Sequence, residues 1–160
     1  MSCNGDLMQW QKDSFLVSSD RALLDFEVIY QFIANSYWAK NIPRQTLQKG
    51  IDNALCFGLY DSDKQVGFAR VISDCATFGY LADVFVLPSH QGKGLGKWLI
   101  SCIMAHPDLQ GLRRFMLATA DAHGLYRQFG FDAVNMPERL MQVHKPDIYA
   151  SQARQKPDIT

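Results

Sequence analysis

The chain of 160 residues lacks a surplus of charge, a long apolar run and the start of an export signal. Its 16 Lys and Arg balance 16 Asp and Glu, so the net charge attracts it to neither nucleic acid nor an anionic membrane. No apolar run approaches the about 20 residues of a membrane-spanning helix. The first residues have neither the basic start nor the apolar core of a signal peptide. We therefore expect a cytoplasmic protein with no membrane and no nucleic-acid partner.

The sequence also lacks paired cysteines. Cys3, Cys56, Cys75 and Cys102 contain no C-x-x-C pair, and three of them stand in apolar segments, where a reduced thiol acts as a small hydrophobic group. The two histidines beside loops or prolines, His90 and His106, do not have the spacing of metal ligands. The sequence predicts no disulfide and no metal site.

Apolar residues make up 48% of the chain and aromatic residues 12%, which is enough for one hydrophobic core. The length leaves little room for a second domain. The last residues are polar and poor in large apolar side chains. We expect one domain over residues 1–149 and a polar tail over 150–160.

The spacing of apolar residues predicts the order of helices and strands. Two helices come first: one over 26–33, capped by Asp20 or Asp25, and one that opens at Pro43. The following elements are a hairpin of strands over 55–60 and 66–72, a strand over 77–87, a helix over 95–103, a strand over 114–119, a helix over 121–129 and a last strand around 140–143; one further strand near 7–17 stays unassigned. This order predicts an α/β fold, with helices on both faces of a mixed, mostly antiparallel sheet.

The densest chemical signal is a glycine-rich turn that joins a strand to a helix over residues 87–98. Three glycines in six residues let the backbone approach a phosphate, and the helix N-terminus adds positive charge. The turn fits neither a P-loop, since Gln91 and Trp98 stand at its required positions, nor a G-x-G-x-x-G dinucleotide motif. The alternative interpretation is that the glycines only form a tight turn.

Two motifs in this region resemble a known family. Gln91-x-x-Gly94-x-Gly96 follows an apolar strand, and Leu125-Tyr126-x-x-x-Gly130-Phe131 comes about thirty-five residues later. Together they resemble the GNAT superfamily of acyl-CoA-dependent N-acetyltransferases. The resemblance extends over about residues 50–143 and implies the GNAT fold, with acetyl-CoA as cosubstrate and no metal.

The resemblance implies two sets of cofactor-binding residues. The main chain of Val84, Phe85 and Val86 would pair with the pantetheine arm, and one of these amides would polarise the thioester oxygen. The loop would hold the pyrophosphate, and Thr119 stands where many members have a cofactor-binding Asn. The expected loop residues are Gln91, Gly92, Lys93, Gly94, Leu95, Gly96 and Lys97.

The resemblance also points to catalytic residues. Tyr126 matches the position that protonates the departing thiolate, although it could be a core tyrosine only. Asp83 is the first candidate for a base or for an acceptor contact, and the equally open alternative is a structural partner of Arg70. His123, three residues before Tyr126, is a second candidate base or a surface group.

The acceptor pocket of this fold brings in Tyr37, Trp38 and Arg44, with Arg70 and His123 nearby, although aromatic residues are often just core. The leading hypothesis is direct transfer of acetyl to a primary amine of a small molecule. The alternatives are a protein or peptide N-acetyltransferase and a non-catalytic CoA-binding module. A homodimer is a possible assembly.

Overall fold

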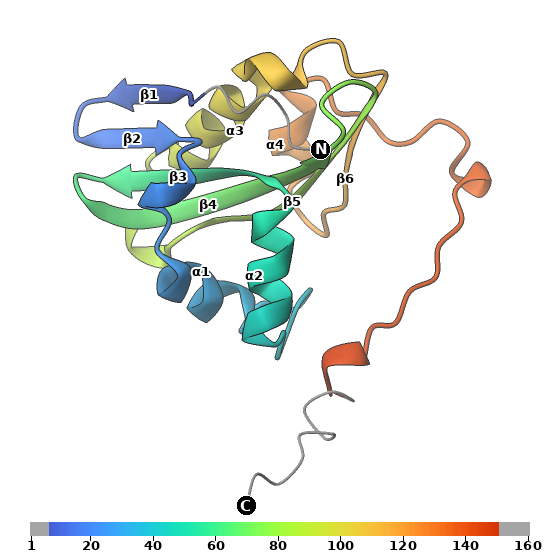
Figure 1. Ribbon diagram of the computed structural model, residues 1–160. Helices are drawn as coiled ribbons and strands as arrows, with labels where there is room; N and C mark the ends of the chain where they lie inside the picture. The colour runs from blue at the N-terminus through green and yellow to red at the C-terminus, as the bar shows by residue number, and fades with distance from the viewer. Residues whose placement is uncertain (1–6, 151–160) are drawn as a thin grey trace, which may run out of the picture.

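A computed structural model describes residues 7–150 and has one six-stranded sheet with the strand order β1-β2-β3-β4-β5-β6 (Figure 1). Neighbouring strands are antiparallel, except β5 and β6, which are parallel. The N-terminal strand left unassigned in the sequence is in fact two strands, which form a hairpin. The strands are β1 (Gln9–Lys12), β2 (Phe15–Ser18), β3 (Leu55–Asp61), β4 (Lys64–Ser73), β5 (Phe78–Val86) and β6 (Arg114–Leu117).

In the described part of the chain, four α-helices cover the sheet on both faces (Figure 1). Helices α1 (Phe26–Ile33) and α2 (Arg44–Asp52) lie on one face, and α3 (Leu95–Ala105) and α4 (His123–Arg127) lie on the other. Asp25 caps α1 by accepting hydrogen bonds from the next backbone amides, whereas Asp20 caps a short 3-10 helix. The predicted α/β fold with a mostly antiparallel sheet is confirmed.

Each face of the sheet has its own hydrophobic core. On the α3 face, Leu99 and Ile103 pack with Phe57 and other strand residues. On the α1 and α2 face, Ile29, Leu47 and their neighbours pack with strand residues such as Phe68 and Phe85. Because residues alternate between faces along a strand, β4 and β5 contribute to both cores. These two cores fix β5, which carries the site described below.

The predicted last strand around residues 140–143 is wrong for this chain. Pro137–Arg139 form a 3-10 helix instead, and the segment that follows is unpaired within residues 7–150. Leu140, Met141 and Val143 are 42%, 96% and 90% exposed. Met136, with a φ of 62°, and Pro137, which has no amide hydrogen, end any regular ladder just before the segment.

The prediction of no disulfide is also wrong, because Cys75 is disulfide-bonded. Cys56 and Cys102 are free and buried, as expected of small core residues. Cys3 and the polar tail beyond Ala150 lie outside the described residues. Among residues 7–150, the structure has no helix with the length and hydrophobicity needed to cross a membrane.

Candidate active site

A cleft of about 990 Å³ opens where β5 and β6 separate. The two strands pair only from Phe78 to Leu81, opposite Arg114–Leu117, whereas β5 continues to Val86. Among the strands of residues 7–150, none therefore lies beside this edge of the second half of β5. One wall of the cleft is residues 80–86 and the opposite wall is residues 117–122, with Tyr126 and part of the glycine loop between them. Its volume is large enough for a cofactor or for another ligand of similar size.

The end of β5 offers main-chain groups to the cleft. The Leu87 amide donates to the Val66 carbonyl on β4 at 2.8 Å. Because successive residues of an antiparallel strand direct their main-chain groups to opposite edges, Val86 directs its groups away from β4. The Val86 carbonyl accepts a hydrogen bond from Gln91 Nε2 at 2.9 Å. The Val86 amide is thus directed to the free edge, and Gln91 ties the glycine loop to the strand.

Phe85 has a different role from its neighbours. Its side chain is buried on the α1 face, stacked on Phe32 with ring centroids 4.1 Å apart and tilted against Phe68 at 6.1 Å. Val84 and Val86 pack on the opposite core. The side chain of Phe85 therefore anchors the strand, while Phe85 is also one of the residues that line the cleft.

The glycine loop ends in an uncapped helix N-terminus. Gly92 and Gly94 have φ values of 81° and 75°, a region that L side chains rarely adopt, and a Cβ atom at either would meet nothing within 4 Å. Gly94 is the N-cap of α3, and it offers no side-chain hydrogen bond. The first turn of α3 contains no acidic residue. Its first amides, including those of Leu95 and Gly96, therefore have no intrahelical partner, and amides of this kind can bind an anion.

The first turn of α3 packs against the end of β5 at Gly96, where a side chain would make only an ordinary contact. A Cβ atom at this position would lie 3.9 Å from Val86 Cγ2. Gln91, Gly92 and Gly94–Gly96 line the cleft, whereas Lys93 and Lys97 are exposed and are not part of its lining. The two lysines contribute charge from outside the cleft.

Tyr126 lies on α4 with its ring buried and lines the cleft. The ring packs edge-on against Phe131, with centroids 6.0 Å apart. Within residues 7–150 no group hydrogen-bonds its hydroxyl, and burial raises the pKa of the phenol. Thr119 also lines the cleft, and its Oγ1 accepts a hydrogen bond from the Ala122 amide at 3.0 Å, which shapes the entry into α4.

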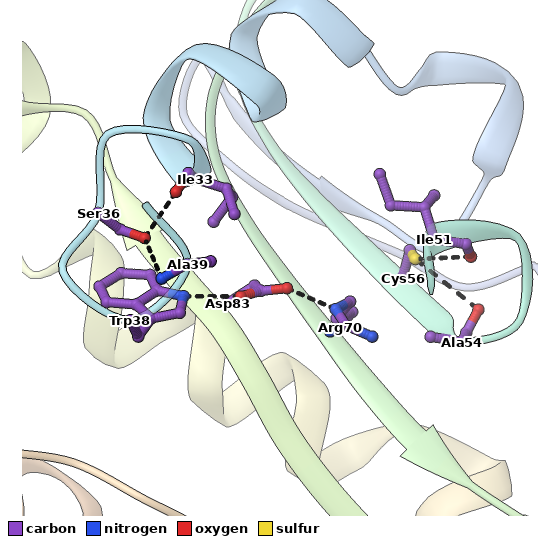
Figure 2. A network of polar contacts seen from close by, with 9 residues as sticks. All are labelled: Ile33, Ser36, Trp38, Ala39, Ile51, Ala54, Cys56, Arg70 and Asp83. Carbon is purple, nitrogen blue, oxygen red and sulfur yellow. Dashed lines mark hydrogen bonds and ion pairs between the residues drawn. The ribbon is translucent and has the colours of Figure 1, made fainter. Parts of the chain in front are cut away.

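The Asp83 carboxylate accepts hydrogen bonds from two side chains, as Figure 2 shows. Its Oδ2 accepts a hydrogen bond from Arg70 Nε at 2.5 Å, and its Oδ1 accepts one from Trp38 Nε1 at 2.7 Å. The Asp83 side chain is 6% exposed and that of Arg70 is 19% exposed. The ion pair that we considered as the alternative for Asp83 is therefore present, while a role of Asp83 as base stays a prediction.

A β-bulge presents Asp83 to the cleft. Arg70 faces Ala82 and Phe68 faces Phe85, so Ala69 on β4 faces two residues of β5. Asp83 is one of these two, and its φ is 56°. Aspartate tolerates this left-handed region better than most residues do. The bulge bends the strand at the point where β5 leaves β6.

Aromatic side chains line the end of the cleft beside Asp83. Tyr37 and Trp38 lie on the turn after α1 and contact each other edge-on, with centroids 5.1 Å apart. The Ser36 hydroxyl donates to the Ile33 carbonyl and accepts from the Ala39 amide, which holds the turn in shape (Figure 2). The turn thus fixes the indole that donates to Asp83.

The structure does not bring every candidate together. His123 is exposed on α4 and does not line the cleft. Arg44 is on the outer surface of α2, where it pairs with Glu27 at 2.5 Å and stacks on Tyr30. Three aromatic residues of the lining were missed in the sequence: Phe32, Tyr80 and Tyr149. Tyr80 could have been found, because it is in the same strand as Asp83, whereas nothing local marks Tyr149.

Comparisons with known proteins agree with this geometry. Residues 52–133 match the acetyltransferase (GNAT) domain family. The chain is 36% identical over 140 residues to a Gibberella zeae protein assigned as an acetyltransferase, and the match covers 73% of this chain and 78% of that protein.

Solved structures give the same result. A crystal structure from Xanthomonas campestris, assigned as an acetyltransferase of the GNAT family, has 52% identity and a TM-score of 0.83, covering 85% of this chain and 96% of that one. A more distant acetyltransferase-like structure from Clostridium acetobutylicum, solved with acetyl-CoA, shares the fold at 12% identity and a TM-score of 0.53, covering 76% and 92%.

Proposed function

Since the chain belongs to the GNAT family of acetyltransferases, we propose that it transfers acetyl directly from acetyl-CoA to a primary amine of a small molecule. One observation carries the proposal: the free edge of β5 ends at an uncapped, glycine-lined helix N-terminus. An extended arm with an anionic group at one end matches that combination, because strand edges bind extended chains and helix N-termini bind phosphates.

The residues present fit acetyl-CoA. The space beside Gly92 and Gly94 is open, and the first amides of α3 would hold the pyrophosphate. The main chain of Val84 to Val86 would hold the pantetheine arm, and the Val86 amide is directed to that edge. When bound, acetyl-CoA supplies an activated acyl group. Gln91 keeps loop and strand at a fixed spacing through its contact with Val86.

Tyr126 acts as the general acid in this proposal. Its buried phenol has a pKa raised above the ordinary value of about 10, so it keeps its proton throughout the neutral range. A phenol of this kind donates a proton to a thiolate whose conjugate acid has a pKa of about 8.5. Within residues 7–150 no group competes for the hydroxyl, which leaves it available to a ligand in the cleft.

Asp83 orients the amine in this proposal. If the carboxylate took up a proton, it would weaken its contact with the Arg70 guanidinium, so direct proton abstraction costs an ion pair. The carboxylate lines the cleft and can accept a hydrogen bond from an ammonium or from a water molecule that carries the proton away. Trp38 and Tyr37 offer aromatic faces to the same cation.

Direct transfer is supported by the state of the cysteines. Burial raises the pKa of Cys56 and of Cys102 to about 11, so neither is a thiolate at neutral pH. Cys75 is disulfide-bonded. None of these three cysteines lines the cleft, so residues 7–150 offer no acyl-carrying thiol there.

The proposal is tested by following free thiol while the protein is incubated with acetyl-CoA and a panel of amines, amino acids and peptides. We expect release that depends on a small primary amine. Calorimetric titration with acetyl-CoA gives the binding step separately. Binding without amine-dependent release would favour a CoA-binding module, release with peptides alone would favour a protein N-acetyltransferase, and absence of binding would refute the assignment of the loop.

A further inference from the structure

A histidine at the start of the glycine loop uses both of its ring nitrogens. The Nε2 atom of His90 lies 2.9 Å from Asp61 Oδ2, and its Nδ1 atom lies 2.7 Å from the Ser89 hydroxyl. The ring also contacts Phe15 edge-on, with centroids 6.3 Å apart. The side chain is only 18% exposed, and the residue lines the cleft. Three neighbours therefore hold this ring at the point where the loop begins.

Asp61 is a fixed anchor for the ring. It is the last residue of β3, and its Oδ1 accepts a hydrogen bond from the Ser14 hydroxyl at 3.0 Å. Beside it, the Ser62 amide donates to the Ser14 carbonyl at 2.9 Å. The carboxylate is thus tied to the turn between β1 and β2 as well as to its own hairpin. Through His90, the glycine loop is connected to β1, β2 and β3, three strands whose residues do not line the cleft.

Two consecutive residues hold the start of the loop. Gln91 donates a hydrogen bond to a carbonyl of β5, and His90 contacts the end of β3. The next residues include Gly92 and Gly94, and glycine loses more backbone freedom than other residues when a ligand orders it. Contacts that order the loop beforehand reduce this loss. His90 is therefore placed to raise the affinity for a ligand through the shape of the loop.

The contacts of His90 persist when the ring takes up a proton. An ionised carboxylate only accepts hydrogen bonds, so the neutral ring donates from Nε2 to Asp61 and accepts at Nδ1 from the Ser89 hydroxyl. After protonation, Nδ1 donates to the same hydroxyl, which can also accept. Neither state therefore requires the loop to move. Protonation changes the charge of the pair with Asp61 from minus one to zero.

Other charged side chains lie on each segment beside His90. Within residues 7–150 they are Lys12 and Asp13 on the β1–β2 hairpin, Asp61, Asp63 and Lys64 on the β3–β4 hairpin, and Lys93 and Lys97 on the loop. Carboxylates and amines ordinarily titrate outside the range from pH 5 to pH 8, in which histidine changes its charge. The hydrogen bond with His90 is the main cause that lowers the pKa of Asp61, so this carboxylate stays ionised throughout that range.

We propose that His90 is a positioning residue for the cosubstrate: it fixes the start of the glycine loop, and its protonation strengthens the binding of acetyl-CoA. This role rests on the proposed function, because it takes the pyrophosphate to lie at this loop. An anion is bound more tightly when a negative charge beside it is neutralised. Bound pyrophosphate in turn favours the protonated ring, so the contribution of His90 to the affinity increases as the pH falls through the neutral range.

Two substitutions separate the shape of the loop from its charge. His90→Phe keeps a ring against Phe15 but removes both hydrogen bonds, and we expect the Kd for acetyl-CoA to rise by about 10-fold. His90→Gln keeps hydrogen-bonding groups without a charge, so it should recover part of the lost affinity. The ratio of its Kd to that of the wild type should increase by about 3-fold from pH 8 to pH 6, the effect of a unit charge roughly 8 Å away in a mostly aqueous environment.

Calorimetric titration with acetyl-CoA at pH 6, 7 and 8 measures these ratios, in which the titration of the ligand's own phosphates cancels. His144→Gln is the matched control, because His144 is exposed and does not line the cleft, and it should bind as the wild type does at each pH. At saturating acetyl-CoA, kcat and the KM for the acceptor should stay unchanged in both His90 variants. Melting temperatures show that the variants are folded.

The outcomes separate this role from the proposed function. If the wild type binds acetyl-CoA and both His90 variants bind it equally well at each pH, the role of His90 is refuted and the proposed function stands. A ratio for His90→Gln that does not vary with pH would overturn the effect of protonation. If the wild type does not bind acetyl-CoA at any pH, the assignment of the loop is refuted, and the role of His90 with it.

Discussion

The replacement Tyr126→Phe tests the chemical step with little structural disturbance. The ring stays in its contact with Phe131, and within residues 7–150 no group loses a hydrogen bond when the hydroxyl is removed. The change in the free energy of unfolding should therefore stay within about 0.5 kcal/mol. Loss of a general acid typically costs 10²- to 10⁴-fold in rate, which corresponds to roughly 3 to 5 kcal/mol in the activation barrier. We expect kcat to fall by about that factor, with acetyl-CoA affinity nearly unchanged.

The pH dependence of activity is a second test of Tyr126 as the general acid. Burial raises the pKa of its phenol, so the proton is fully held at neutral pH and is lost only above the ordinary value of about 10. Wild-type activity should therefore not decline between about pH 7 and pH 9 on account of this group. The assay is free-thiol release at saturating substrates, with the melting temperature as a folding check. Tyr80→Phe, which removes another hydroxyl from the cleft lining, is the control. An unchanged kcat for Tyr126→Phe across this range would refute the assignment of the acid.

Three further changes test the loop, the ion pair and a contact beside the loop. Gly94→Ala, at a φ of 75°, should cost about 1 kcal/mol and weaken acetyl-CoA binding in calorimetry, whereas Gly124→Ala, in open space, should not; equal affinities would contradict the loop assignment. Asp83→Asn should lower the free energy of unfolding in urea by about 3 kcal/mol, because Arg70 loses a buried partner, and a neutral result would mean that the pair adds nothing. The hydrogen bond with His90 is the main cause that lowers the pKa of Asp61 in the folded protein. The ionised Asp61 therefore stabilises the fold fully above the ordinary carboxyl pKa, and this stabilisation is lost as the pH falls through the lowered pKa. Asp61→Asn should reduce the loss of unfolding free energy that the wild-type protein shows as the pH falls through the acidic range. An unchanged pH dependence would show that the contact between Asp61 and His90 does not contribute to that loss.

Most helices and strands could be predicted because their signals are local. The α3 stripe, which includes Leu95, Leu99 and Ile103, repeats at helical spacing and is buried as expected. Asp25 stands where an N-cap is needed and accepts the expected amide hydrogen bonds. Such signals depend only on neighbours in the sequence. The strand near Leu140 carried a similar local signal and did not form, because a strand also requires pairing with another strand, and no local spacing specifies that pairing.

The site could be predicted in part for the same reason. The glycine loop is a contiguous motif, and its backbone geometry follows from residue type at Gly92 and Gly94. The contact between Trp38 and Asp83 joins residues 45 positions apart, and no local spacing encodes it. Tyr149 lines the cleft although it follows the long exposed segment over residues 132–148, and this again depends on tertiary structure. Residue chemistry therefore predicted the side of the cleft at the glycine loop better than the side at Trp38 and Tyr149.

The bulge at Asp83 connects the shape of the cleft to its charge. A left-handed residue within a strand costs about 1 kcal/mol, and it persists only where the surroundings fix it. Here Arg70 and Trp38 hold both carboxylate oxygens, so the ion pair offsets the strain of the bend. Because a bulge increases local bending and twist, the same residue directs β5 away from β6 directly after Leu81, where their pairing ends. The carboxylate in the cleft and the free edge of β5 thus have a common structural cause. A protein that kept the edge without the charge would need another way to hold the bulge.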